Sequence, residues 1–196
     1  LLVLNAGVLP GAERIVTRDG IEVTTAASLG GHHALTVLLL RAGRLAPGAR
    51  IVISGSEGAR GDAPGMKPLD LSAFAREHFG GDLEKAMRAV MTMDPPARHH
   101  WSTTYCTAKA LVALWAVALR DRLPPRMAVH AVSPGNVPTT RAARNQPWYF
   151  RGMMHLTGVV GPAMGMATSA SVGASRYLDA AAMPAETSGA FWASPP

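Results

Sequence analysis

The sequence predicts an α/β fold in which helices cover both faces of a parallel sheet. Short apolar runs alternate with longer stretches of helical periodicity, an order typical of right-handed strand–helix–strand units. These runs are apolar at nearly every position, which indicates strands buried on both faces. Each run ends in small or polar residues, at the carboxyl end where ligands of such sheets bind. We therefore expect a doubly wound parallel sheet that forms one domain over residues 1–196.

The first two strands and the helix between them lie at the start of the chain. The apolar run 1–4 is followed by a turn at 5–7, and the run 49–56 ends in small residues. Residues 19–46 are helical, and Gly30-Gly31 inside them indicates close packing, because each glycine costs about 1 kcal/mol relative to alanine. A strand buried on both faces belongs in the middle of a sheet, so we expect further residues upstream of the first run.

Residues 57–102 interrupt the alternation, and we interpret them as an insertion or lid within the domain. Glycines and prolines open this segment, two short helices are expected at 71–79 and 83–93, and Pro95-Pro96 closes it. The later elements are a helix at 103–123, a strand at 127–133, a loop-rich segment at 141–166, a helix at 169–182 and a strand at 189–193.

The composition narrows the classes of partner. The net charge is +6, but the arginines are spread along the chain and the densest group holds only Arg141, Arg144 and Arg151, so no nucleic-acid surface is expected. The single cysteine, Cys106, forms no internal disulfide and favours a reducing compartment, the cytoplasm. The best apolar run, 110–119, is half the length that a membrane span needs.

Two side chains of the helix 103–123 point to acid–base chemistry. Tyr105 and Lys109 are four residues apart, so they share one face of the helix. A cation beside a phenol favours the phenolate and is expected to lower the pKa of Tyr105, which makes tyrosine usable as an acid or base. Ser56 follows the strand 49–56, where its hydroxyl can hydrogen-bond the carbonyl oxygen that Tyr105 protonates.

Five motifs in this order resemble the short-chain dehydrogenase/reductase family. They are LNAG at 4–7, RDGIEVTTAASLGGHHALT at 18–36, RIVISGS at 50–56, YCTAK at 105–109 and SPGNVPT at 133–139. A later segment, SVGASRYLDAA to SGAFWA, is similar to the family's last helix and strand. The resemblance implies a Rossmann-like domain of which this chain is the second half, beginning at the family's fourth strand.

The resemblance also implies roles for individual residues. Tyr105 would donate or accept the proton, Lys109 would lower its pKa and bind the nicotinamide ribose, and Ser56 would orient the substrate carbonyl. The cofactor would be NAD or NADP, with hydride moving between nicotinamide and a carbonyl or alcohol carbon. The adenosine side would be lined by Asn5, Ala6 and Gly7, and the nicotinamide end by Pro134, Gly135, Val137 and Thr139.

Two departures from the family pattern keep an inactive alternative open. The glycine-rich turn that seats the pyrophosphate is absent, and Ser28 stands where the family has a catalytic Asn that holds a water linked to the lysine. Serine is shorter, so the proton relay is expected to be weaker or rerouted. The alternative to an oxidoreductase is therefore an inactive remnant, either a pseudoenzyme or an interaction module.

Other chemistries fit less well. The segment 54–58 is close to the GxSxG nucleophile elbow of hydrolases, but the elbow needs a helix directly after its serine, and here GARGDAPG follows Glu57. The histidine pairs 32–33 and 99–100 are adjacent residues that point apart on a helix, so no metal site is expected.

The sequence also indicates a class of substrate and two alternatives for the state of association. The lid and the segment 141–166, with Trp148, Phe150, Met153 and Met154, suggest an apolar pocket for a lipophilic alcohol or ketone. The helices 19–46 and 103–123 are apolar on more than one side. This favours either a homodimer, as family members commonly pair through these helices, or burial of both faces within one subunit.

Overall fold

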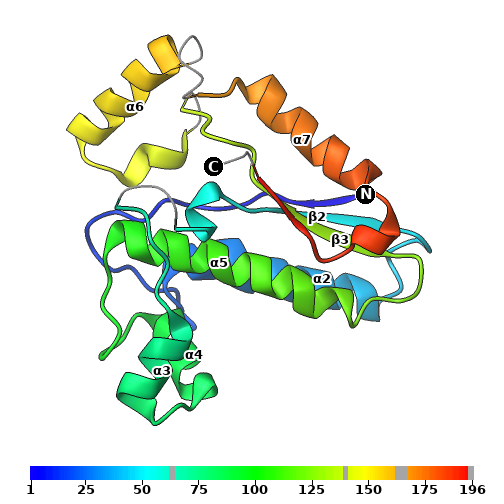
Figure 1. The fold of residues 1–196 in the computed structure, drawn as a ribbon, viewed down its shortest axis with the longest axis horizontal. Coiled ribbons are helices and arrows are strands. Elements are labelled where there is room, and N and C mark those ends of the chain that lie inside the picture. The colour runs from blue at the N-terminus through cyan, green and yellow to red at the C-terminus, as the bar shows by residue number, and fades with distance from the viewer. Residues whose placement is uncertain (62–64, 139–140, 162–166, 194–196) are drawn as a thin grey trace.

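A computed structural model describes residues 1–61, 65–138, 141–161 and 167–193. Within them, four strands form one parallel sheet in the order β1 (Leu2–Leu4), β2 (Arg50–Ser54), β3 (Ala128–Val132) and β4 (Phe191–Trp192). Helices α2 (Gly31–Arg41) and α5 (Trp101–Arg120) cover one face of the sheet and α7 (Ala170–Ala182) covers the other (Figure 1). The predicted α/β fold with a parallel sheet between helices is confirmed.

Side chains of the central strands alternate between the two helical layers, as the two-residue period of a strand requires. Ile51 and Ile53 of β2 pack toward α5, where Val112 and Ala116 join them in a cluster with no solvent exposure at these four positions. Val52 points to the opposite face and packs with residues of α7. The sheet therefore separates two apolar layers, and both must be filled for it to be stable.

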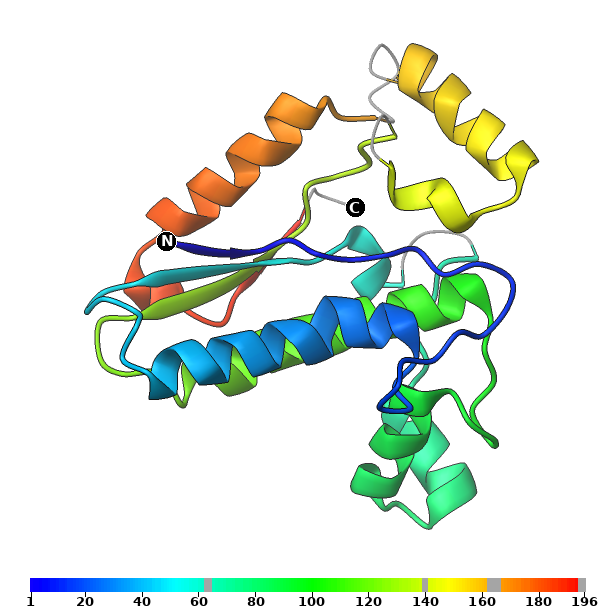
Figure 2. The same ribbon diagram turned by 180° about the vertical axis from the view of Figure 1, so that it is seen from behind.

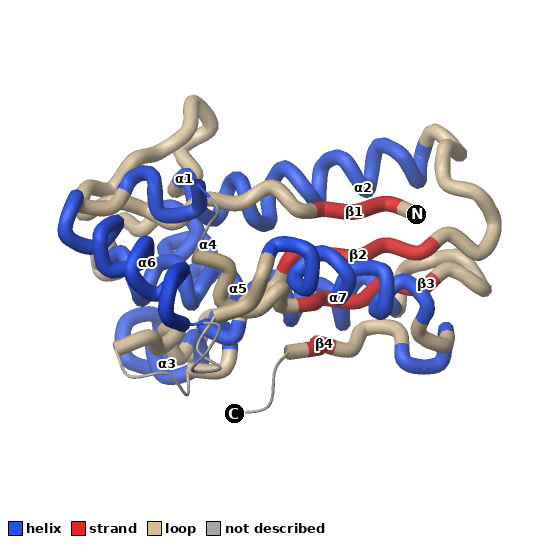
Figure 3. The backbone as a smooth tube through the Cα atoms, turned by 90° about the horizontal axis from the view of Figure 1, so that it is seen from above, coloured by secondary structure: helices blue, strands red, loops and turns tan. Residues whose placement is uncertain are grey.

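The connection from β3 to β4 differs from the two before it. The strands are parallel and follow each other in sequence order across the sheet, yet α7 crosses on the face opposite α2 and α5 (Figure 3). The β3–α7–β4 unit therefore has the opposite hand to the β1–α2–β2 and β2–α5–β3 units. The expectation that all units are right-handed is wrong for this fold.

Strand β1 lies at one edge of the sheet, next to β2 alone. Leu4 is buried, but Val3 points to the other side and is 43% exposed. Within the described residues, burial of this strand is therefore observed on the side of Leu4 and not on the side of Val3.

One continuous helical stretch follows the turn after β1, and it changes pitch along its length. It begins as α1 (Val23–Thr25), widens to a π-helical turn over η1 (Ala26–Gly30), and continues as α2. Glu22 caps the start, since its buried side chain accepts from the backbone N–H groups of Thr24 at 2.9 Å and Thr25 at 3.0 Å. The glycine interruption expected from the sequence thus takes the form of a π turn, a feature common at functional sites.

The insertion 57–102 forms a helical pair with its own small core. Helices α3 (Leu71–Phe79) and α4 (Leu83–Thr92) start at Asp70 and Asp82, whose carboxylates cap them. This pair projects away from the sheet below α5, at the end where the strands finish (Figure 2). Its buried side chains include Phe74 and Val90, and they meet the main body at Leu29 and Leu111. Closure of this segment as a lid stays a prediction.

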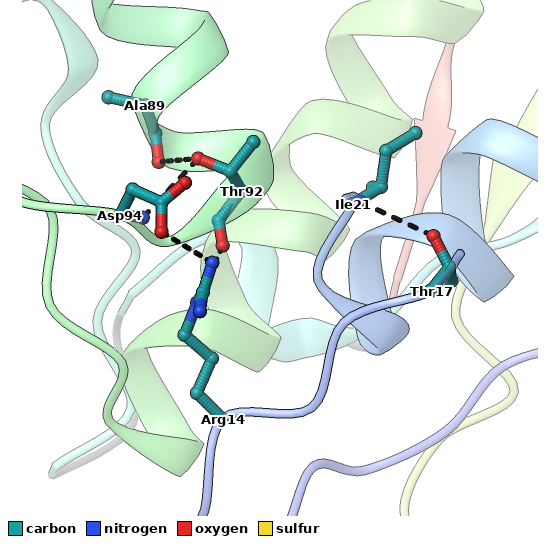
Figure 4. A network of polar contacts seen from close by, with 6 residues as sticks. All are labelled: Arg14, Thr17, Ile21, Ala89, Thr92 and Asp94. Carbon is teal, nitrogen blue, oxygen red and sulfur yellow. Dashed lines mark hydrogen bonds and ion pairs between the residues drawn. The ribbon is translucent and has the colours of Figure 1, made fainter. Parts of the chain in front are cut away.

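The long turn after β1 is tied to the insertion by Arg14. Its guanidinium donates to the Thr92 carbonyl oxygen at 2.8 Å and pairs with Asp94 at 2.5 Å, as Figure 4 shows. The backbone N–H of Glu22 also donates to the Met91 carbonyl oxygen at 2.9 Å. The end of α4 is therefore fastened to the same turn that leads into the π-helical stretch.

The segment 141–166 is more helical than the sequence predicts. A 3-10 helix, η3 (Arg141–Asn145), is followed by α6 (Trp148–Val160), which stands apart from the sheet on the side of α7 (Figures 1 and 2). Two glycines inside this stretch favoured a loop, because glycine weakens an isolated helix. No residue of α6 is fully buried.

Two helical stretches of the described residues, Val23–Arg41 and Trp101–Arg120, are long and apolar enough to cross a membrane by length and composition. In the fold both pack under the sheet, and α5 supplies ten buried residues to the interior. Their apolar character therefore has a structural explanation in the core.

Candidate functional site

The carboxyl ends of β1, β2 and β3 meet at one edge of the sheet. The strand register pairs Leu4 with Ile53 and Ser54 with Val132, so the residues that follow these strands are neighbours. This edge holds the small and polar residues after each strand, as the sequence predicts, and α5 passes beneath it.

Tyr105 and Lys109 lie one turn apart on α5 and face this edge. The Lys109 Nζ atom lies 5.9 Å from the centre of the Tyr105 ring, and it donates to the Ser54 carbonyl oxygen at 2.9 Å. Neighbouring positions of α5 are small and fully buried at Cys106, Ala108 and Val112, which lets the helix pack closely against the sheet. Close packing carries the lysine into the interior, where its side chain is only 4% exposed.

Burial lowers the pKa of Lys109 to about 8. The charged ammonium loses water on entering the protein, and one carbonyl oxygen replaces only part of that solvation. Lys109 nevertheless remains mostly protonated at neutral pH.

Ser56 and Tyr105 are brought together by the turn after β2. A hydrogen bond from the Ser56 side chain lowers the pKa of Tyr105, but burial, the largest cause, raises it, and Glu57 adds to the rise. The net direction is upward, opposite to the lowering that we expected from Lys109. The phenol is therefore protonated at neutral pH, because removal of water disfavours the phenolate more than its neighbours stabilise it.

Ser56 does not have the environment of a hydrolase nucleophile. It caps a single 3-10 turn, η2 (Glu57–Ala59), by accepting from the Gly58 N–H at 3.2 Å. The long helix that a nucleophile elbow requires does not follow it.

Ser28 lies in the π-helical turn and faces the lysine. It is fully buried, and its hydroxyl has no hydrogen-bond partner within the described structure. A Cβ atom added at Gly7 would lie 3.5 Å from both Ser28 Oγ and Lys109 Nζ. The missing side chain of Gly7 therefore leaves a small polar space that these two groups share.

His32 is a neighbour of this space that the sequence did not single out for the site. It follows Ser28 by one helical turn and is 5% exposed. Burial lowers its pKa, and the charge of Lys109 lowers it further. The only signal in the sequence was its four-residue spacing from Ser28, which had no weight until Ser28 was placed beside Lys109.

The turn after β1 is held by a tyrosine that sequence reasoning also missed. Asn5, Ala6 and Gly7 are exposed at the end of the strand. The Tyr177 hydroxyl of α7 donates to Asn5 Oδ1 at 2.9 Å and lies 2.8 Å from Ser54 Oγ. This contact joins β1, β2 and α7 over 172 residues of sequence, a separation at which no local pattern could have indicated it.

The turn after β3 is fixed by its own hydrogen bonds. Gly135 has φ +83°, a conformation that favours glycine, and its N–H donates to Ser133 Oγ at 3.2 Å. Pro134 and Val137 flank it and are half-buried, whereas the predicted cofactor contact Thr139 lies outside the described residues. The Ser133 hydroxyl also donates to Glu57, which pairs with Arg176 at 3.9 Å.

The residues from which an apolar pocket was predicted lie on different sides of α6, and the pocket itself stays a prediction. Phe150 and Met154 are half-buried on the inner side of α6, but Trp148 is 83% exposed and Met153 is 53% exposed. These two side chains point to solvent because they lie on the outer face of the helix. A separate cavity of about 240 Å³ lies between β3, β4 and α7, and it contains none of Tyr105, Lys109 and Ser56.

No group of three or more His, Cys, Asp or Glu side chains in the described ranges is arranged to hold a metal ion. The assembled site instead offers a phenol, a hydroxyl and a buried amine. Such a set can protonate, hydrogen-bond and stabilise an oxygen atom that gains negative charge.

The structure is an α/β fold in which a phenol, a hydroxyl and a buried amine lie together at the carboxyl edge of a parallel sheet. No protein-family model and no curated protein matches the chain. Among solved structures, it is similar to salutaridine reductase from Papaver somniferum, with 18% identity and a TM-score of 0.49. The match covers 86% of this chain and 53% of that one, so the chain spans about half of the reductase's length.

Proposed function

We propose that this chain carries the catalytic groups of a nicotinamide-dependent oxidoreductase that interconverts a carbonyl compound and an alcohol. The observation that supports this most directly is the meeting of Tyr105, Ser56 and the buried amine of Lys109 at one sheet edge. These groups come from separate stretches of sequence, and their order is that of the family the motifs resemble.

The residues present fit a nicotinamide nucleotide. The space beside Gly7 is lined by Lys109 Nζ and Ser28 Oγ and has no side chain of its own. Lys109 would bind the nicotinamide ribose, while the turn Asn5–Gly7 would hold the adenosine side. Pro134, Gly135, Val137 and Thr139 would hold the nicotinamide end. When bound, NAD or NADP supplies or accepts the hydride.

The side chains of this chain would then transfer the proton to the substrate. Tyr105 is protonated at neutral pH, so it would donate its proton to the carbonyl oxygen of the substrate. Ser56 would hydrogen-bond the same oxygen and orient it. The ammonium of Lys109 would stabilise the phenolate that remains, because opposite charges favour each other's ionised form.

Binding of the nucleotide is the first test. Each of NAD, NADH, NADP and NADPH would be added at millimolar concentration in a thermal unfolding experiment. A ligand at 100 times its Kd stabilises a protein by about 2.7 kcal/mol. For a domain of this size we expect the better coenzyme to raise Tm by roughly 5–10 °C.

The outcome also separates the two alternatives that the sequence left open. A rise in Tm with one coenzyme pair supports the oxidoreductase and assigns NAD or NADP. No rise with any of the four would contradict the proposal and favour the inactive remnant. The variant Lys109→Met serves as the matched control, since it removes the amine that would meet the ribose.

Ser28→Asn is expected to raise the turnover of an active form several-fold. Asn has the reach to hold a water near Lys109, whereas the Ser28 hydroxyl has no partner in the described structure. The measurement is kcat for carbonyl reduction at saturating coenzyme, with the adjacent substitution Leu29→Met as a control for repacking of the turn. An unchanged or lower kcat in Ser28→Asn would reject the relay argument.

We also propose a state of association, a substrate class and a cellular location for this chain. Pairing of two copies through α2 and α5 is supported by the outward apolar side chains Leu35, Leu38, Leu114 and Val117, which are 41–63% exposed. A lipophilic alcohol or ketone as substrate is supported by Phe150 and Met154. A cytoplasmic location is supported by the single, buried cysteine.

A further inference from the structure

Helix α6 exposes an unusual amount of apolar surface. Its six outward apolar side chains are between 45% and 83% exposed: Trp148, Tyr149, Met153, Leu156, Val159 and Val160. At about 100° per residue, these six positions occupy one continuous arc of roughly 140° on the helix. A contiguous apolar surface of this kind marks a docking site rather than ordinary exposure.

The other side of the helix faces the protein. Phe150, Met154 and Thr157 fall on the opposite arc, and all three are half-buried. The Phe150 ring meets Trp101 at the start of α5, with ring centres 5.3 Å apart and planes inclined by 69°. The helix is therefore anchored through one side, and its apolar outer face is not the side that packs on the fold.

Positive charge borders the outer face. Arg151 lies next to Trp148 on the helical wheel and is exposed, and the exposed Arg144 precedes the helix in η3. Over residues 122–178 the sequence has six arginines and neither Asp nor Glu. An apolar stripe with aromatic residues at one end and cations at its border has the chemistry of a helix that lies in a membrane interface.

We infer that the outward face of α6 docks on an anionic lipid surface, with its axis in the plane of the membrane. The apolar arc would enter the boundary between headgroups and acyl chains, and Arg151 and Arg144 would meet lipid phosphates or carboxylates. A second copy of this chain is a poorer occupant, because pairing two such faces would bring their cationic borders together. The anchoring contact is made on the inner side of α6, by Phe150 with Trp101, which precedes Tyr105 by one turn of α5.

Vesicle co-sedimentation of the full chain tests the inference. The probes are vesicles of phosphatidylcholine alone and of phosphatidylcholine with roughly 30% phosphatidylserine, at about 0.1 M salt. We expect binding to the anionic vesicles, weaker binding to the neutral ones, and loss of the difference at high salt. Fluorescence gives a second readout, since Trp148 should shift its emission to shorter wavelength when it enters the bilayer.

Matched variants assign the effect to α6. Leu156→Ser should weaken vesicle binding about tenfold, whereas Leu83→Ser, on the insertion at the other side of the sheet and 53% exposed, should not change it. Arg151→Gln should weaken binding to anionic vesicles about fivefold, and Arg151→Lys should restore it. All four substitutions are at exposed positions and leave the interior packing intact.

Three results would overturn the inference. They are no binding to anionic vesicles, binding that Leu156→Ser leaves unchanged, or a dimer in sedimentation that Leu156→Ser converts to a monomer. The last result would assign the face to a second copy instead. None of these measurements uses coenzyme or turnover, so they stand whether or not the proposed oxidoreductase function holds.

Discussion

Tyr105→Phe is expected to lower the rate of carbonyl reduction by about 10²- to 10⁴-fold, the contribution of a positioned proton donor. The substitution removes one oxygen atom from a partly buried side chain and leaves the ring that Lys109 faces. Coenzyme binding should therefore persist, and kcat should fall while the Tm increase with NAD(H) or NADP(H) stays. The measurement is the decrease in nicotinamide absorbance during reduction of a panel of ketones.

The matched control for this prediction is Tyr149→Phe. It makes the same chemical change at a tyrosine on α6 that is 63% exposed, and it should leave the rate within about twofold of the original, as expected of a surface position away from the reacting atoms. Equal losses in both variants, or full activity in Tyr105→Phe, would remove Tyr105 from the proposed chemistry.

Lys109→Met is expected to stabilise the fold at pH 7 while it abolishes the response to coenzyme. Burial lowers the pKa of Lys109 from 10.5 to about 8, and each unit corresponds to about 1.36 kcal/mol. The charged amine thus costs about 3 kcal/mol at neutral pH, whereas the variant leaves the Ser54 carbonyl oxygen without this donor, which costs about 1 kcal/mol. Methionine has a similar length and no charge, so the free energy of unfolding should rise by about 2 kcal/mol.

The stability difference between Lys109→Met and the original protein is expected to change with pH. Between pH 8 and 10.5 the unfolded chain keeps the Lys109 proton that the folded protein has lost, so the original protein gains stability as pH rises. The excess in free energy of unfolding of Lys109→Met over the original protein should therefore shrink across this window. Burial also raises the pKa of Cys106, to about 11, but that thiol is present in both proteins and cancels in the difference.

Chemical denaturation of the two proteins at pH 7, 8, 9 and 10 provides the measurement. A variant that is less stable at pH 7, or a difference that does not change with pH, would mean that the amine is well solvated. A buried lysine that lowers stability but serves ligand binding and proton transfer would match the general trade between stability and activity at functional sites.

Local patterns predicted most of the secondary structure. The helix expected at 71–79 is α3, and the strands expected at 49–56 and 127–133 contain β2 and β3. These elements have strong periodicity and clear boundaries in Gly, Pro and Asp. Helix α6 was missed because its apolar residues cover most of its circumference and two glycines interrupt it, so neither period nor propensity favoured a helix.

The site was predictable where chemistry and sequence order coincide, and not where it depends on burial. Tyr105, Lys109 and Ser56 were indicated by spacing and by their positions after strands. The upward direction of the Tyr105 pKa was not, since it depends on how much water the fold removes. The hydrogen bond from Tyr177 to Asn5 and the opposite hand of the β3–β4 connection both depend on which face of the sheet α7 covers. The local sequence of a helix does not determine which face of a sheet it covers, so neither feature could be predicted.

The π-helical turn at Ala26–Gly30 lies between two apolar clusters, the core under the sheet and the core of the α3–α4 pair. Leu29 packs on the core under the sheet and also on the core of the α3–α4 pair, and it is the residue next to Ser28. Leu29 is therefore one of several contacts, with Leu111 and Arg14 among the others, that join the helical pair to the rest of the fold. A change in the position of the helical pair is therefore expected to alter the packing next to Ser28, the residue whose hydroxyl faces Lys109.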